Sequence, residues 1–65
     1  MILVNDLIGL MAKHGFTNKA MAQSLGMSPK TFGLKLKKGV FGSDEIEVMI
    51  KLLDIENPAD IFFAH

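Results

Sequence analysis

The sequence predicts an all-α protein, a compact bundle of five helices, and three observations indicate this class. Apolar residues recur at the three- and four-residue spacing that places them on one face of a helix. Capping residues and glycines stand at the ends of these apolar stripes. No stretch shows the apolar–polar alternation of a half-buried strand. A chain of 65 residues is long enough for one small hydrophobic core, so we expect a single domain over residues 1–65.

The first helix is expected over residues 5–13. The Asn5–Asp6 pair supplies the candidate N-cap, because either side chain can accept a hydrogen bond from a free amide of the first turn, and Gly15 is the candidate residue just past the end. Ile2 and Ile8 fall off the inward stripe and are expected to be exposed. The expected inward stripe consists of Leu3, Leu7, Leu10, Met11 and His14.

The stretch from Thr17 to Gly39 predicts two short helices joined by a tight turn. Thr17 is a plausible cap for a helix over residues 18–25, and Gly26 provides the positive φ that ends a helix sharply. The inward side chains of the pair are expected to be Met21, Ala22, Leu25, Phe32 and Leu36.

The second helix of this pair is expected over residues 29–38. Ser28 precedes Pro29, a cap followed by proline at the first helical position, where the missing N–H is not needed. Ala22 is small where the two helices would cross at a steep angle. These features agree in phase and indicate a helix-turn-helix.

Two further helices follow a loop in which Phe41 is expected to close the core. Ser43 is the candidate N-cap of the fourth helix, whose first turn is acidic and so suits the positive end of the helix dipole. The pair Asn57–Pro58 begins the fifth helix with a second cap-plus-proline pattern. The expected core stripe of the fourth helix is Ile46, Met49, Ile50 and Leu53.

The net charge is zero, but the two signs are separated along the chain. Residues 13–38 contain six lysines and no acidic residue, whereas residues 39–65 contain one lysine and six acidic residues. A cationic segment that coincides with the paired helices is typical of a protein that binds a polyanion, although a solvated lysine face has the same composition. All the cationic side chains are lysines, so bidentate reading of guanine by arginine is excluded.

The composition argues against an enzyme, a metal site and a bound cofactor. The chain has no cysteine, and its two histidines lie far apart in the sequence. His14 is expected to pack and to interact with a helix dipole. Residues 1–4 are apolar but far too short for a signal peptide or a membrane span. We therefore expect a cytoplasmic protein with no membrane contact and no small-molecule substrate.

The segment from Thr17 to Gly39 resembles the helix-turn-helix of phage repressors and Cro-like regulators, the Xre-type DNA-binding domains. The positions that match are Ala22, Leu25, Gly26, Met27, Ser28, Phe32 and Leu36. The likeness extends over roughly residues 6–63, and residues 55–63 are similar to the end of short repressor-like proteins from phages and prophages of Gram-positive bacteria. The resemblance implies a lambda-repressor-like fold and transcriptional regulation through double-stranded DNA.

The resemblance also implies how the two helices would meet DNA. The second helix would lie in the major groove, and the start of the first would meet a phosphate. Lys30 is the candidate for reading guanine, Leu34 for touching a thymine methyl, and Lys35 for neutralising phosphate with other lysines. We expect this flank to be uncovered. The residues that the resemblance places at the DNA are Thr17, Asn18, Lys19, Ser28, Pro29, Lys30, Thr31, Gly33, Leu34, Lys37 and Lys38.

Three of these positions depart from the pattern of base-reading members. Pro29 and Leu34 stand where polar residues are usual, and Gly33 has no side chain, so none of the three supplies a hydrogen bond. Two interpretations follow. The chain is a DNA-binding regulator whose specificity is loose, or it is a protein-binding modulator or antirepressor that uses an apolar face. We expect the first; an enzyme and a domain kept only for its fold are the remaining alternatives.

The chain has more apolar residues than one small core requires. A homodimer would bring two reading helices to half-sites about 34 Å apart, one turn of DNA. The alternative is that most of these residues complete the core. The candidates for a dimer surface are Val48, Leu52, Phe62 and Phe63, together with Ile8.

Overall fold

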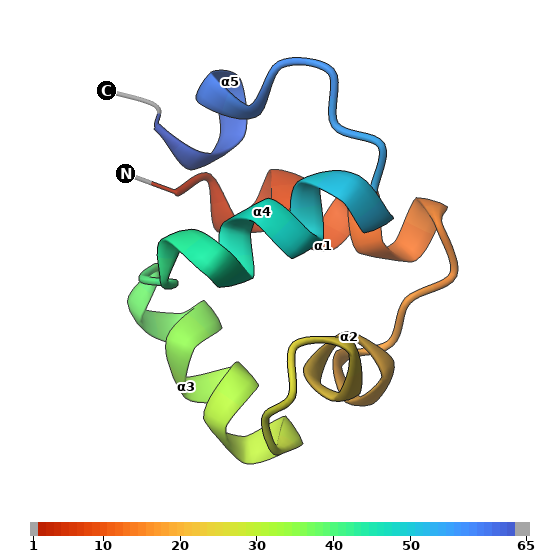
Figure 1. The fold of residues 1–65 in the computed structure, drawn as a ribbon, viewed down its shortest axis with the longest axis vertical. Helices are drawn as coiled ribbons and strands as arrows, with labels where there is room; N and C mark the ends of the chain where they lie inside the picture. The colour runs from red at the N-terminus through yellow and green to blue at the C-terminus, as the bar shows by residue number, and fades with distance from the viewer. Residues whose placement is uncertain (1, 64–65) are drawn as a thin grey trace.

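The computed structural model describes residues 2–63 and shows five helices joined by short connections (Figure 1). No strand occurs among these residues. The predicted all-α, five-helix class is therefore confirmed. The second helix of the predicted helix-turn-helix has the expected bounds, residues 29–38. The helices are α1 (Val4–Lys13), α2 (Asn18–Ser24), α3 (Pro29–Lys38), α4 (Ser43–Leu52) and α5 (Pro58–Phe62).

Two of the predicted N-caps form the hydrogen bonds that hold a first helical turn. Thr17 Oγ1 accepts a hydrogen bond from the amide of Ala20 at 3.0 Å. Ser28 Oγ accepts one from the amide of Thr31 at 3.1 Å. Each side chain satisfies an amide that has no partner within the helix, a contribution of about 1 kcal/mol per cap. Local sequence thus fixes where α2 and α3 begin.

The start of α1 differs from the prediction because the C-terminal helix holds the segment before it. The Leu3 amide donates to the carbonyl of Ile61 at 2.7 Å, and Leu3 takes the N-cap position. The helix begins at Val4, so Asn5–Asp6 lies inside the first turn, and no side chain caps the helix. The predicted cap is therefore wrong.

The start of α4 is also capped differently from the prediction. Ser43 is the first helical residue, and Gly42 is the N-cap. The Glu45 side chain folds back toward the start of the helix, and its Oε1 accepts a hydrogen bond from the Gly42 amide at 2.8 Å. The side chain that holds the first turn of α4 is therefore Glu45 and not Ser43. At the start of α5, Asn57 has the predicted cap position, but its side chain makes no cap hydrogen bond.

Helices α2 and α4 end in the same geometry, a residue with positive φ followed by an apolar residue. After α2, Gly26 has φ 73°, and the Met27 amide donates to the carbonyl five residues back. After α4, Asp54 has φ 49°, and the Ile55 amide makes the equivalent bond. In both places the positive φ turns the chain so that an amide past the helix end bonds to a carbonyl that the helix leaves without a partner. Among the described residues, Asp54 is the one non-glycine with positive φ.

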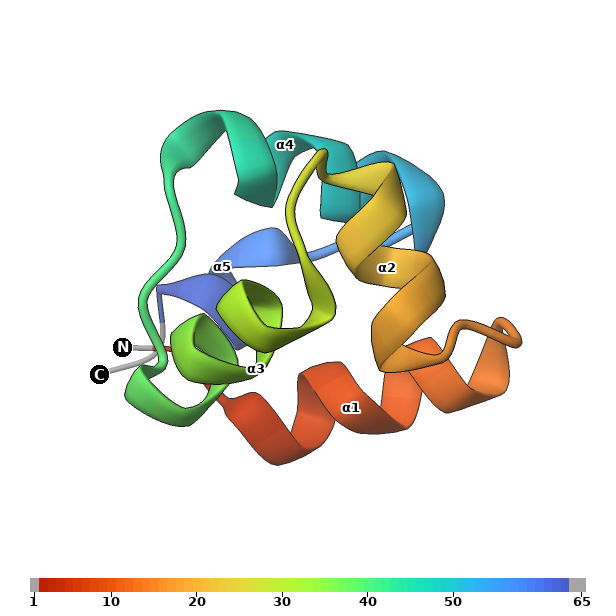
Figure 2. The same ribbon diagram turned by 90° about the horizontal axis from the view of Figure 1, so that it is seen from below.

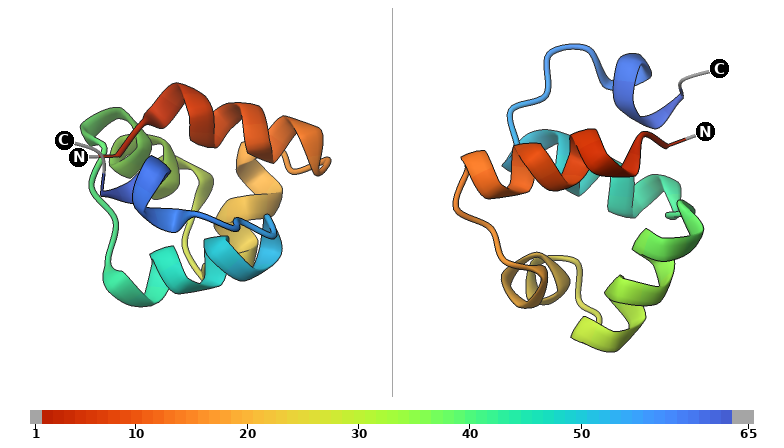
Figure 3. Two further views of the ribbon diagram at one scale, coloured as in Figure 1. Left: turned by 90° about the horizontal axis from the view of Figure 1, so that it is seen from above. Right: turned by 180° about the vertical axis from the view of Figure 1, so that it is seen from behind.

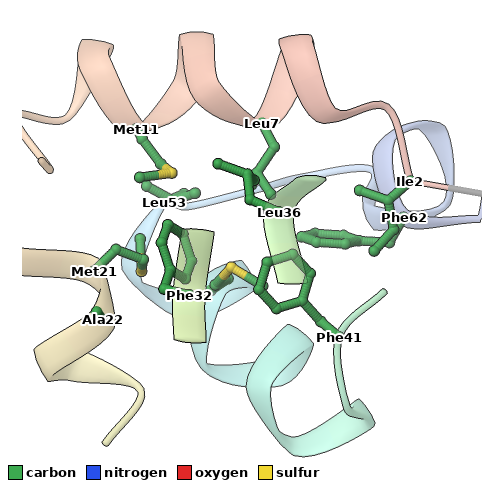
Figure 4. Close-up of a cluster of buried hydrophobic side chains, with 11 residues drawn as sticks. Ile2, Leu7, Met11, Met21, Ala22, Phe32, Leu36, Phe41, Leu53 and Phe62 are labelled. Atoms are coloured by element: carbon green, nitrogen blue, oxygen red, sulfur yellow. The ribbon is translucent and has the colours of Figure 1, made fainter. Parts of the chain in front are cut away.

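The core lies between the five helices, as Figure 4 shows. Phe32 is completely buried, and its ring centroid lies 5.6 Å from that of Phe41, with the rings tilted by 45°. The predicted role of Phe41 in closing the core is confirmed. The buried side chains are Ile2, Leu7, Met11, Met21, Ala22, Phe32, Leu36, Phe41, Met49, Leu53 and Phe62.

Three predictions about burial are wrong. Ile2 is buried, and it lies beside Phe62 (Figure 4), because the N-terminal segment pairs with α5. His14 is exposed, since the inward stripe of α1 ends at Met11 before the chain turns away. Phe62 is 2% exposed and belongs to the core, so it cannot form a dimer surface, whereas Phe63 is 56% exposed.

Helices α2 and α3 lie at the opposite end of the molecule from α5, with α1 and α4 between them (Figures 1 and 3). Seen from below, in Figure 2, α2 and α3 lie nearest the viewer. No helix of residues 2–63 is long and apolar enough to cross a membrane. The fold thus carries the α2–α3 pair on a base made by the other three helices.

Candidate nucleic-acid interface

Helices α2 and α3 pack against each other across the turn of residues 25–28. Ala22 is completely buried between them, and Met21 and Phe32, also without exposed surface, lie beside it (Figure 4). A small side chain at this point lets two helices approach closely over a short turn. The predicted helix-turn-helix is therefore the observed arrangement.

The first turn of α3 is held by its own side chains. Ser28 Oγ donates to Thr31 Oγ1 at 3.0 Å, in addition to accepting from the Thr31 amide. Pro29 occupies the first helical position and is exposed, as are Ser28 and Thr31. Because Thr31 Oγ1 receives the Ser28 hydrogen, its own hydroxyl hydrogen points elsewhere and can donate to a ligand. Two hydrogen bonds thus hold this turn, and it is open to solvent.

The side of α3 that points away from the core carries lysines and one leucine. Leu34, Lys37 and Lys38 follow Lys30 by four, seven and eight residues, which places all four on one side of the helix. The opposite side carries the buried Phe32 and Leu36. Leu34 is 53% exposed, and Lys30 is exposed, so the expected uncovered flank is confirmed. This set, the outer face of α3, consists of Lys30, Leu34, Lys37 and Lys38.

The two helices of the helix-turn-helix carry positive charge and no negative charge. Neither α2 nor α3 contains an acidic residue, and Lys37 and Lys38 stand in the last turn of α3. Cations at a helix C-terminus also interact favourably with the helix dipole. The acidic residues lie on α1, α4, α5 and the connections near them. Charge therefore favours an anionic partner at this end of the molecule.

The first turn of α2 presents three of the predicted site residues. Thr17, Asn18 and Lys19 are all exposed. The Thr17 hydroxyl accepts the Ala20 amide, so it holds the turn. The side chains of Asn18 and Lys19 make no hydrogen bond or ion pair with other described residues, and both can reach a ligand.

Lys35 has a role that the sequence analysis missed. Its Nζ donates to Glu45 Oε2 at 2.7 Å and to Oε1 at 3.0 Å, and so it joins α3 to the first turn of α4. The hydrogen bond from Lys35 is the main cause that lowers the pKa of Glu45 below its ordinary value of 4.5, and the Gly42 amide adds to it. Lys35 is thus paired within the chain rather than presented to phosphate, which corrects the expectation.

Gly33 lies in α3 next to the outer face and is half-buried. A Cβ built at this position would meet no atom within 4 Å. Packing inside the described part of the chain therefore does not require glycine here. The position is open to whatever approaches α3.

A comparison with protein-family models matches residues 7–39 to the family described as bacterial regulatory protein, Fis family. The matched region starts within α1 and ends at Gly39, directly after α3, so it contains the whole helix-turn-helix and just over half of the chain. The comparisons with curated proteins and with solved structures found no match. The chain belongs to the Fis family of bacterial regulatory proteins and is a DNA-binding regulator of the helix-turn-helix type.

Proposed function

We propose that the outer face of α3 enters the major groove of duplex DNA, and that the chain regulates transcription in the manner of phage repressors and Cro-like proteins. One observation carries this proposal: the three lysines and the leucine on the outer face of α3, a capped helix, are all exposed to solvent. The major groove is wide enough to admit such a helix. The sequence resemblance to short phage and prophage repressors supports the repressor type.

The position of each lysine along α3 suggests its contact. Lys30 lies in the first turn, the part of a recognition helix that meets base edges, and its ammonium can donate to O6 and N7 of guanine. Lys37 and Lys38 lie in the last turn, where contacts to the sugar-phosphate backbone are usual. Ser28, Pro29 and Thr31 form the start of α3, the end of the helix that would enter the groove.

The exposed start of α2 supplies further contacts to the backbone. The proposal assigns Lys19 to a phosphate as a counter-charge and Asn18 to a phosphate oxygen as a hydrogen-bond donor. Thr17 keeps the first turn of α2 in shape through its bond to Ala20. Contacts of this kind position the protein on the duplex without reading its sequence.

The proposal includes a homodimer, because one small domain makes few phosphate contacts and binds weakly at physiological salt. Val48 and Leu52 are 36% and 37% exposed and lie one turn apart on α4, which supports a surface for a second copy. Sedimentation equilibrium of the whole chain tests this. A dimer that Leu52→Glu converts to a monomer supports the pairing, and a monomeric wild type at high concentration overturns it.

Binding of a duplex of mixed sequence, followed by fluorescence anisotropy at several salt concentrations, tests the DNA-binding proposal. The logarithm of the affinity should fall linearly with the logarithm of the salt concentration, by about 0.9 for each phosphate neutralised. Lys30→Ala should weaken binding. Lys51→Ala removes an exposed lysine from α4 and is the matched control that should bind as the wild type does. An affinity that does not change with salt would overturn the proposal.

The exposure of Leu34 favours one second candidate, a modulator that binds a protein partner through α3. Leu34→Glu separates the two functions, because a new carboxylate is repelled by phosphate and disrupts an apolar contact. The second candidate requires that this variant lose its protein partner. If the partner still binds while DNA binding is lost, the modulator function is excluded.

A further inference from the structure

The outer face of α3 combines three cations with one large apolar side chain. Leu34 is 53% exposed, and on the helix surface it is adjacent to Lys30 one turn before it and Lys38 one turn after it. Its neighbour Gly33 has no side chain to reach a base. Leu34 is therefore the one aliphatic group that this face presents to a ligand.

The lysines around Leu34 decide which kind of partner suits this face. An apolar protein surface that covered Leu34 would also have to desolvate the ammonium groups beside it, which is costly without opposite charges. Duplex DNA supplies those charges on its phosphates while its groove receives the helix. The charge pattern thus favours DNA as the occupant, with Leu34 directed at the base edges.

The major groove offers a single aliphatic group, the C5-methyl of thymine, and cytosine lacks it. Building on the DNA binding proposed above, we propose that Leu34 is a specificity-determining residue that selects thymine through this methyl group. The lysines of the outer face do not detect this methyl group, because an ammonium donates only to acceptor atoms such as O4 of thymine or O6 and N7 of guanine. Readout by this chain then combines the apolar contact of Leu34 with the hydrogen bonds of Lys30.

The expected size of the effect follows from the burial of one methyl group. Removing a methyl-sized group from water changes an equilibrium by about fourfold. A duplex that lacks the thymine methyl should therefore bind about fourfold more weakly for each methyl that Leu34 covers. The phosphate contacts, which do not depend on the base, should be unchanged.

The experiment compares two short alternating A·T duplexes that differ in one respect, deoxyuridine in place of every thymidine. Charge and hydrogen-bonding groups are the same in both, and only the C5-methyl is missing. Affinities of the whole chain are measured by fluorescence anisotropy at one salt concentration. Leu34→Ala tests the residue, and Ile8→Ala, which truncates an exposed apolar side chain on α1, is the matched control.

We expect the wild type and Ile8→Ala to bind the uracil duplex more weakly, and Leu34→Ala to bind both duplexes equally. A further arm replaces cytosine by 5-methylcytosine in an alternating G·C duplex, where the added methyl should strengthen binding of the wild type. Circular dichroism of Leu34→Ala checks that the variant retains the helical fold.

The other outcomes overturn the inference in distinguishable ways. Equal binding of both duplexes by the wild type excludes a methyl contact and leaves DNA binding intact. An equal loss in the wild type and in Leu34→Ala assigns the methyl effect to the shape of the DNA rather than to this residue. No binding to any duplex overturns the proposed function, and the selection of thymine with it.

Discussion

Lys35 Nζ lies 2.7 Å from Glu45 Oε2, and this ion pair joins α3 to the first turn of α4. The same carboxylate accepts the Gly42 amide through Oε1, so Glu45 caps α4 and anchors α3 at once. Its side chain is 14% exposed, and that of Lys35 is 36% exposed. The pair thus ties the last turn of α3 to the first turn of α4.

Loss of the Glu45 charge should destabilise the fold. Glu45→Gln keeps a side-chain oxygen for the Gly42 amide and removes the attraction for Lys35. We expect a loss of about 1 kcal/mol in the free energy of unfolding at pH 7, a modest value because the lysine is partly solvated. Urea denaturation measures it. Glu47→Gln, which removes a largely exposed carboxylate 3.8 Å from Lys51, should cost nothing measurable.

The contribution of Glu45 should also depend on pH. Because its pKa is lowered in the folded state, the stabilisation is complete above the ordinary value of 4.5 and is lost as the pH falls through the lower folded-state pKa. Urea denaturation of the wild type and of Glu45→Gln from pH 7 downward should show two curves that converge at acid pH. Curves that stay parallel over this range would show that the charge contributes no stability.

Lys35 and Lys37, both on α3, should differ in their effect on DNA binding. Lys37 is exposed on the outer face, so Lys37→Ala should weaken binding and reduce the salt slope by about one unit. Lys35 is paired with Glu45, so Lys35→Ala should lower stability and leave the salt slope unchanged. Affinities at several salt concentrations give both slopes. A reduced slope for Lys35→Ala would show that the pair opens on DNA.

The parts of the fold that local signals determine could be predicted from the sequence. The bounds of α3 follow from Ser28, Pro29 and Gly39, which act on the residues next to them. The exposure of Lys30 and Leu34 follows from helical periodicity, because Lys30, Leu34 and Lys38 recur every four residues and so lie on one side of the helix. The buried Phe32 and Leu36 lie on the other side. The spacing of residues along α3 therefore predicts which side of the helix points away from the core.

The parts that depend on contacts distant in sequence could not be predicted. Ile2 is buried because the segment that carries it pairs with Ile61 near the other end of the chain. The ion pair of Lys35 with Glu45 spans a loop, and no periodic pattern marks it. Periodicity assigns residues to a side of one helix, but it does not say which element covers that side.

Asp54 should be a site where glycine stabilises the protein. Its φ of 49° is costly for a residue with a Cβ, and it stands just past the end of α4, where glycine is usual. Asp54→Gly should raise the free energy of unfolding by about 0.5–1 kcal/mol. Thermal denaturation should show this as a rise of several degrees in Tm, since about 4–8 °C corresponds to 1 kcal/mol in a domain of this size.

The control for Asp54 is alanine, which removes the same charge and keeps the Cβ. Asp54→Ala should lower Tm, because alanine adopts the left-handed conformation less readily than aspartate does. If both variants raise Tm equally, the gain comes from removal of the carboxylate rather than from relief of backbone strain.

Two helical glycines, Gly9 in α1 and Gly33 in α3, should respond alike in stability and differently in DNA binding. A Cβ at either position would meet no atom within 4 Å, so alanine removes the entropic cost of glycine without a clash. Each substitution should raise the free energy of unfolding by about 0.5–1 kcal/mol. Denaturant titration of the two variants against the wild type measures the gain.

DNA affinity then separates the two positions. Gly33 adjoins the outer face of α3, so an added methyl stands between the helix backbone and the duplex and should weaken binding severalfold. Gly9 is exposed on α1, outside the α2–α3 pair, and Gly9→Ala should bind DNA as the wild type does. Because both variants are expected to be more stable than the wild type, weaker binding by Gly33→Ala alone cannot be attributed to unfolding. Unchanged affinity in Gly33→Ala would place the duplex away from this residue and confine the interface to the lysine-bearing positions around Leu34.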